Sequence, residues 1–168
     1  SQTMLDAWNR QLPADFHLVV KGSRFITHLK KLQDCRQPLE EFWSRVGQLR
    51  TLRVVLWQLP PMMPKDLDRL ESFLSILPGP VRHAVEFRHP SWWDDEVAGL
   101  LSHYKMAFAA ISHPSLPATI YPTTDFLYLR FHGLGDQLYR YDYSRAELAD
   151  WAARLRPHLD TQSLYAFF

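Results

Sequence analysis

The stretch "VEFRHPSWW" (residues 85–93) joins an apolar run to a group of ionisable and aromatic residues. Glu86 and Arg88 stand where the apolar run 81–87 ends, and Pro90 follows. A short apolar run that stops at a proline predicts a buried strand with polar side chains at its carboxyl end. Whether these groups form a site depends on what the other strands carry at the same end.

The same pattern repeats along the chain, where apolar runs alternate with amphipathic segments of helical period. Six runs predict strands: 16–21, 53–61, 81–87, 106–112, 126–133 and 163–168. Five segments predict helices: 4–12, 38–52, 65–77, 94–104 and 144–159. Ser144 and Glu147 have the spacing of a capping box, and 113–125, with three prolines, is expected to be a loop. Apolar strands that alternate with helices are typical of an α/β protein with a parallel sheet.

The composition limits the class of protein. The chain has 168 residues, of which 46% are hydrophobic, and this predicts one domain with a sizeable core. A net charge of +1 gives no bulk-charge reason to expect a nucleic-acid or membrane partner. The single cysteine, Cys35, cannot form an internal disulfide, so a reducing, cytoplasmic setting is expected. The sequence shows neither a signal peptide nor an apolar stretch long enough to span a membrane.

Polar side chains recur at the ends of the predicted strands. Six of them lie at the carboxyl ends of four predicted strands: Lys21, Gln58, Glu86 with Arg88, and Arg130 with His132. The carboxyl ends of parallel strands lie on one edge, where barrel and open-sheet enzymes build their sites. Alternation along a strand puts Glu86 on one face with Arg88, and Arg130 on one face with His132. Three cations against one carboxylate predict a cationic mouth that suits a phosphate or a carboxylate.

These residues suggest two roles. Glu86 and His132 are the candidate catalytic acid–base groups, because a positioned carboxylate and an imidazole can exchange protons with a substrate. The candidate substrate-binding residues are Lys21, His28, Gln58, Arg88, Trp92, Arg130 and Tyr141. The basic members of this set are expected to hold an anion, and the aromatic members to stack on a base or a sugar ring.

Each assignment has a structural alternative. Glu86 and Arg88 can form a buried ion pair that only holds the fold. His132, which precedes a glycine, can bond a backbone carbonyl group instead. Trp92 can seal the core against a helix, since two adjacent tryptophans cannot both face one site. Two further candidates can simply be solvated: His28 and Lys21.

Several familiar chemistries are missing. The sequence contains no Gly-rich phosphate loop, no GxSxG elbow and no HExxH motif. Cys35 lies in the polar stretch 31–37, which is expected to be a loop, and it is a poor candidate nucleophile. Glu86, His28 and His132 could supply metal ligands, but the neighbouring arginines repel a cation. Neither a metal nor a cofactor is therefore expected.

Five motifs, in this order, carry a resemblance to a known family: "VKGSRFITH" (20–28), "LWQLPP" (56–61), "VEFRHPSWW" (85–93), "YLRFHG" (128–133) and "YDYSRAELADWA" (141–152). Together they resemble the DUF72 family, the YecE-like UPF0759 proteins. The resemblance covers nearly the whole chain, and "EFRHPSW" is specific. It implies a TIM-barrel fold of unestablished activity. A distant similarity of the family to the endonuclease IV type of barrel implies a nucleic-acid ligand.

The resemblance also implies an incomplete barrel. Family members begin with a "GTSGW"-like strand and a second strand, and they end in an Asn-rich "NND"-like segment. About six of eight strands are then expected here, with the first two βα units and the C-terminal tail missing, so that residues 1–168 form a single partial barrel. A fragment is favoured over an open barrel, because an open sheet exposes its edges. Where the family often has Asp, this chain has Ser112 and His113.

Three functions follow as hypotheses. The first is an enzyme, with hydrolysis as the candidate reaction, that binds a small anionic substrate such as a phosphoester or a sugar phosphate. The second is a nucleic-acid-binding or endonuclease IV-like protein. The third is a non-catalytic barrel in which Glu86 and Arg88 belong to a structural ion-pair network.

Overall fold

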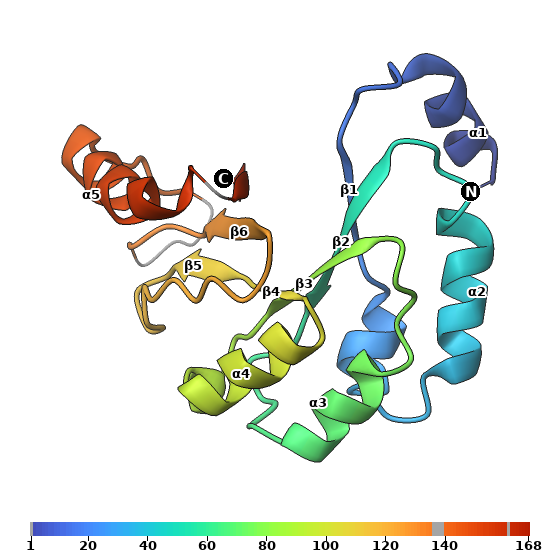
Figure 1. Cartoon of the computed structure of the whole chain (residues 1–168), viewed down its shortest axis with the longest axis horizontal. Coiled ribbons are helices and arrows are strands. Elements are labelled where there is room, and N and C mark those ends of the chain that lie inside the picture. The colour runs from blue at the N-terminus through green and yellow to red at the C-terminus, as the bar shows by residue number, and fades with distance from the viewer. Residues whose placement is uncertain (1, 136–139, 161) are drawn as a thin grey trace.

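The computed structural model describes residues 2–135, 140–160 and 162–168 (Figure 1). The strands are β1 (Leu18–Lys21), β2 (Leu52–Gln58), β3 (Arg82–Glu86), β4 (Ala107–Phe108), β5 (Ala110–Ser112), β6 (Phe126–Phe131) and β7 (Ser163–Phe167). The α-helices are α1 (Gln2–Gln11), α2 (Arg36–Val46), α3 (Leu67–Leu74), α4 (Asp95–His103) and α5 (Arg145–Leu155). Three short helices complete the list: the π-helix η1 (Phe25–Leu29) and the 3₁₀ helices η2 (Pro90–Trp92) and η3 (Arg156–His158).

The strands form parallel sheets, which confirms the predicted α/β class. One sheet has the order β1-β2-β3-β4 and the other has the order β5-β6-β7. Every neighbouring pair is parallel. The strand expected over 106–112 is interrupted at Ala109, whose N–H still continues the bonding to β3 by donating to Val85 O. β4 therefore pairs with β3 and β5 with β6, so the two sheets meet at this interruption.

The helices begin and end where local chemistry allows it. Asp66 and Asp94 cap α3 and α4 by accepting a backbone N–H three residues on. The predicted capping box is confirmed at α5, where Ser144 and Glu147 bond each other's backbone. α2 ends at Val46, six residues before the predicted limit, because Gly47 closes its last turn. η1 was not predicted, since five residues are too few to show a helical period.

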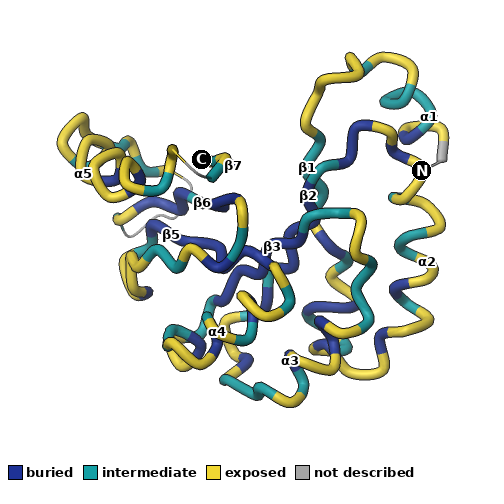
Figure 2. The backbone as a smooth tube through the Cα atoms, viewed as in Figure 1, coloured by how far each residue is buried: buried dark blue, intermediate teal, exposed yellow. Residues whose placement is uncertain are grey.

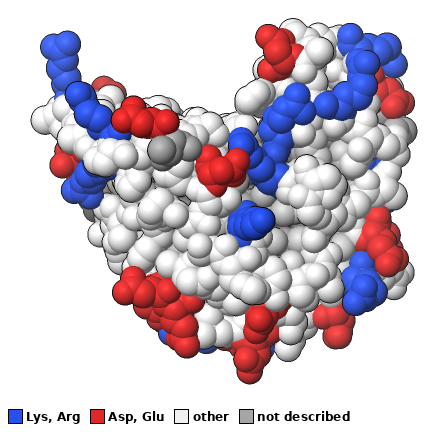
Figure 3. Space-filling view, in the orientation of Figure 1, with Lys and Arg blue, Asp and Glu red and all other residues white. Residues whose placement is uncertain are grey.

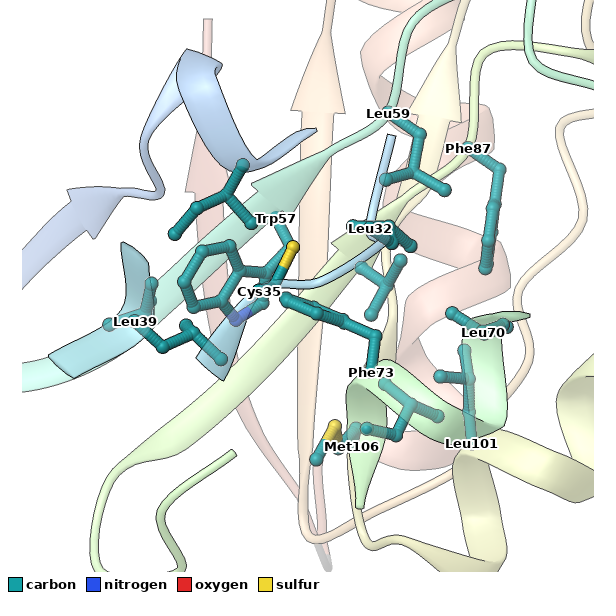
Figure 4. Packing of buried hydrophobic residues seen from close by; sticks show 14 of the residues in the cluster. Leu32, Cys35, Leu39, Trp57, Leu59, Leu70, Phe73, Phe87, Leu101 and Met106 are labelled. Carbon is teal, nitrogen blue, oxygen red and sulfur yellow. The ribbon is translucent and has the colours of Figure 1, made fainter. Parts of the chain in front are cut away.

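The main core lies between the helices and the sheet (Figure 4). It contains Trp57, Phe73, Phe87 and Leu101, all at most 1% exposed. Figure 2 shows the same pattern along the chain, with β2 to β6 mostly buried and helices that turn one face to solvent. Cys35 lies in a turn before α2, as predicted, but it belongs to this core and is buried. Its neighbours in sequence are polar, but the turn that enters α2 points the thiol inward.

The other face of the sheets has its own cluster of buried residues. This cluster consists of Val54, Leu56, Ala84, Ala107, Ala109, Phe126, Tyr128 and Tyr165. Its members come from β2, β3, β4, β6 and β7, so side chains from both sheets meet there. Tyr165 Oη of β7 lies 3.0 Å from His17 Nδ1, just before β1. The last strand therefore bends back towards the first.

The buried His83 links β3 to the core, and its hydrogen bonds predict how the stability of the protein depends on pH. Trp57 Nε1 donates to His83 Nδ1 at 3.1 Å, and His83 Nε2 donates to Pro78 O at 2.9 Å. These bonds require a neutral ring, and burial lowers the pKa of His83 although the bond to Pro78 opposes this shift. The unfolded chain takes up a proton below a pH of about 6.5, whereas the folded ring resists it. The free energy of unfolding should therefore fall as the pH drops through about 6.5.

Urea denaturation between pH 7.5 and 5.5 measures this effect. His83→Gln, which keeps one donor and one acceptor, should show a smaller loss of stability over that range than the unmodified chain. Other histidines also have lowered pKa values, so part of the slope should remain in the variant. An unchanged slope in the variant would contradict the assignment.

No helix in the described ranges is both long enough and apolar enough to cross a membrane.

Candidate functional site

The structure brings Glu86, Arg88, Arg130 and His132 together at the carboxyl ends of β3 and β6. Glu86 Oε1 lies 3.1 Å from Arg88 Nη1 and 3.2 Å from His132 Nε2. Glu86 Oε2 lies 3.0 Å from Arg130 Nη1. The side chains of Glu86 and His132 are fully buried, so the carboxylate is the centre of the arrangement. We call these four residues the Glu86 cluster.

Two further predicted residues border the Glu86 cluster. Gln58 ends β2 in register with Glu86, and its Oε1 accepts from Arg130 Nη1 at 3.4 Å. Lys21 ends β1 on the exposed rim. Partial burial lowers the pKa of Lys21, and the nearby charge of Arg130 lowers it further. Lys21 therefore lies within the electrostatic field of the cluster and adds to its positive charge.

His28 lies beside this rim rather than in the cluster. It belongs to η1, and its Nδ1 is 2.9 Å from Thr27 Oγ1. Burial lowers its pKa, and the charges of Arg24 and Lys21 act in the same direction. Arg24 is exposed and was not among the predicted residues. Its only signal in the sequence is its place in the motif "VKGSRFITH".

The protonation states of the Glu86 cluster follow from the balance of burial and charge. Burial raises the pKa of Glu86, but the His132 hydrogen bond and the charges of Arg130 and Arg88 outweigh it and lower the value to about 2. Burial lowers the pKa of His132 despite the opposing effect of Glu86. At neutral pH Glu86 is therefore an anion, and a neutral His132 donates Nε2–H to it. The basic side chains then outnumber the carboxylate.

The segment after β6 is fixed by a tyrosine that sequence reasoning did not select. Gly133 has φ of 92°, a conformation that glycine adopts readily, and this turns the chain directly after His132. The Gly133 N–H donates to Tyr143 Oη at 2.9 Å, and Tyr143 in turn donates to Ser112 Oγ at 2.8 Å. His113 follows Ser112, and its ring centroid lies 6.2 Å from that of His132. Tyr143 thus ties the end of β5 to the end of β6.

Two predicted ligand contacts lie elsewhere. Trp92 is 0% exposed, its Nε1 donates to Met63 O at 2.7 Å, and its ring stacks on Phe87 at 4.8 Å. It is a core residue, so the prediction that it contacts substrate does not fit the structure. Tyr141 donates to Glu147 Oε1 at 2.6 Å, at the start of α5 rather than at the cluster.

The comparisons with known proteins agree with the motifs. A family model described as "Protein of unknown function DUF72" matches residues 1–168. The chain belongs to the DUF72 family. Among curated relatives, the UPF0759 protein YecE of Escherichia coli K12 is 34% identical over 88 residues, which make up 51% of this chain and 32% of YecE. The matched stretch thus spans about a third of that relative's length.

Solved structures of other DUF72 proteins are similar along nearly the whole chain. One from Thermotoga maritima MSB8 gives a TM-score of 0.83 with 28% identity, covering 100% of this chain and 72% of that one. One from Enterococcus faecalis V583 gives a TM-score of 0.78 with 16% identity, covering 98% of this chain and 75% of that one. At 16% identity the second similarity concerns the fold alone.

The Glu86 cluster of this DUF72 chain is a cationic arrangement and not a set of metal ligands. Both oxygens of Glu86 face N–H donors, and guanidinium groups repel a cation. Within residues 2–135, 140–160 and 162–168, no three His, Cys, Asp or Glu side chains converge as a metal site would require. The chemistry that the cluster can supply is hydrogen bonding to an anion, next to the buried imidazole of His132.

Proposed function

We propose that this DUF72 chain contributes six of the eight strands of a TIM-like barrel and binds a small anion at their carboxyl ends. The parallel order of the strands and the return of β7 towards His17 support the barrel. The position of the Glu86 cluster supports the site, because barrels of this kind bind their ligands at that end.

The observation that carries the proposal is the excess of positive charge over a buried carboxylate. Arg88 and Arg130 retain 11% and 17% side-chain exposure, whereas Glu86 beneath them has 0%. Solvent therefore reaches part of each arginine side chain but not the carboxylate. Among the described residues, Arg130 donates its side-chain hydrogen bonds from Nη1 alone, to Gln58 and Glu86. A guanidinium carries five N–H donors, so one held by Glu86 can still bind a phosphate or carboxylate with another edge.

Hydrolysis extends the proposal and assigns different roles to the two buried groups. Glu86 carries no proton at neutral pH and is engaged by three donors, so it orients the groups around it. His132 is then the acid–base group, because the Glu86 carboxylate favours its Nε2–H tautomer, although Arg88 Nη1 also lies 3.3 Å from Nε2. Binding is better supported than hydrolysis, since neither Glu86 nor His132 has an exposed side chain.

Nucleic acid is the alternative ligand, and one observation favours it. Lys and Arg side chains gather along the hollow between the part that carries α1 and the part that carries α5, while Asp and Glu gather near α3 and α4 (Figure 3). A basic stripe of this kind can follow a phosphate backbone. Binding of nucleic acid should then weaken steeply with salt.

A thermal-shift screen of the full-length protein tests both ligands. Inorganic phosphate, sugar phosphates, small carboxylates, nucleotides and short DNA should be compared in the unmodified protein, Arg88→Ala and Lys21→Met. We expect a small anion to stabilise the protein, with affinity about tenfold lower in each variant, because each loses a charged hydrogen-bond donor. Arg10→Gln, which removes a cation at the end of α1, is the matched control and should bind as before.

Two outcomes contradict anion binding at this site. Equal binding by the unmodified protein, Arg88→Ala and Lys21→Met would place the anion elsewhere. Stabilisation by DNA alone, lost with added salt, would favour nucleic acid instead. Since Lys21 is on the exposed rim, its variant stays informative even if Arg88→Ala reduces stability.

A further inference from the structure

We propose that a pocket between the end of β5 and α5 holds an apolar body of the ligand, so that the ligand is a small amphipathic anion. This inference rests on the proposed function, because the charged group of the same molecule would lie on Arg88 and Arg130. It adds a second part to the site and narrows the ligand from any small anion to a phosphate or carboxylate attached to an apolar, ring-sized group.

The pocket has a volume of about 410 Å³. Apolar side chains supply much of its lining: Ala118, Leu134, Ala146 and Trp151. Ser112 and His113 line it at the end of β5. This volume lies within the usual range for sites that bind small molecules. No residue of the Glu86 cluster lines this pocket or the pocket of about 470 Å³ between α1, η1 and α2, but the ring of His113 in this pocket packs against that of His132.

The polar groups of the pocket already have partners within the protein. Arg154 forms an ion pair with Asp150 at 2.8 Å. Glu147 accepts from the hydroxyls of Tyr141 and Ser144 at 2.6 and 2.7 Å. A second anionic group would meet the carboxylates of Glu147 and Asp150 and be repelled, whereas an apolar group would not. The lining therefore favours an apolar body over a second charge.

One residue joins the pocket to the Glu86 cluster. His113 lines the pocket, and its ring packs edge-on against that of His132 with centroids 6.2 Å apart. Its Nδ1 accepts from the backbone N–H of Ser115 at 3.2 Å, which fixes the ring. The charge of Arg88 also reaches His113, where it adds to the effect of burial in lowering the pKa. His113 therefore adjoins both the pocket and the Glu86 cluster, and the proposed ligand would lie across it.

Three probes that share one charged group separate the two parts of the site: inorganic phosphate, phenyl phosphate and 1-naphthyl phosphate. Isothermal titration calorimetry on the full-length protein should give tighter binding as the ring grows. We expect 1-naphthyl phosphate to bind about tenfold or more tightly than inorganic phosphate, because the ring buries apolar surface. Ala146→Trp fills the pocket from the exposed start of α5 and should remove this advantage while inorganic phosphate binds unchanged.

Ala152→Trp is the matched control. It adds the same side chain on the same helix at an exposed position that does not line the pocket, so it should keep the full advantage of the ring. If inorganic and naphthyl phosphate bind equally to the unmodified protein, or if the advantage survives in Ala146→Trp, the inference is wrong and the anion site stands. If no phosphate probe binds, the proposed function fails and the inference fails with it.

Discussion

Glu86→Gln should lower the free energy of unfolding by about 3 kcal/mol at pH 7, as expected when one partner of a buried ion pair is removed. The amide keeps the shape of the side chain but carries no charge. Arg88 and Arg130 then remain close together without the carboxylate that each contacts. The fall of the Glu86 pKa from 4.5 to about 2 corresponds to a stabilisation of the same size. Urea denaturation at pH 7 measures it, and the exposed Glu41→Gln should change stability by less than about 0.5 kcal/mol.

The pH dependence separates the charge of Glu86 from its packing. Because the folded pKa lies below the unfolded value, the stabilisation is fully present above a pH of about 4.5 and is lost as the pH falls towards about 2. The difference in stability between the unmodified chain and Glu86→Gln should therefore shrink over that window. A difference that stays the same at pH 7 and pH 3 would mean that shape, and not charge, explains the loss.

Trp92→Ala should lower the free energy of unfolding by about 3–5 kcal/mol, the usual loss when a large buried aromatic side chain is removed. The ring is 0% exposed and stacks on Phe87, so its removal leaves a cavity in the main core. Trp92→Phe keeps a ring but leaves Met63 O without its indole donor, and should cost about 1–3 kcal/mol. Urea denaturation of the unmodified protein, Trp92→Phe and Trp92→Ala should give free energies of unfolding that decrease in that order.

Anion binding by the same variants checks the position of Trp92. Trp92→Phe should bind phosphate as the unmodified protein does, because the side chain lies in the core and does not reach the surface. If Trp92→Phe were as stable as the unmodified protein but no longer bound phosphate, Trp92 would have to contact the ligand after all.

The periodicity of the sequence predicts most of the fold because it records which side of each element is buried. Each apolar run overlaps at least one strand, and each amphipathic segment overlaps a helix. The interruption at Ala109 was not predictable, since an alanine in an apolar run gives no sign that the partner strand changes there from β3 to β6. The burial of Cys35 was missed for a related reason. Its polar neighbours describe the surface of the turn and not the direction of the thiol.

Part of the candidate site could also be predicted from the sequence, and part could not. The convergence of Glu86, Arg88, Arg130 and His132 follows from strand ends that share an edge and from side chains that alternate along a strand. Tyr143 could not be selected, because its bonds to Ser112 and Gly133 depend on the path of a loop. Side chains on regular elements could be placed from their spacing, whereas those on turns required the tertiary structure.

The contact between Tyr165 and His17 has a consequence for how the chain folds. The two residues are 148 positions apart, so closing this contact costs more loop entropy than pairing strands that are neighbours in sequence. Strands β1 to β3 can pair as soon as the helices between them form. On the ribosome, in contrast, the curvature that brings β7 back to the start of β1 cannot be fixed until synthesis has passed Tyr165.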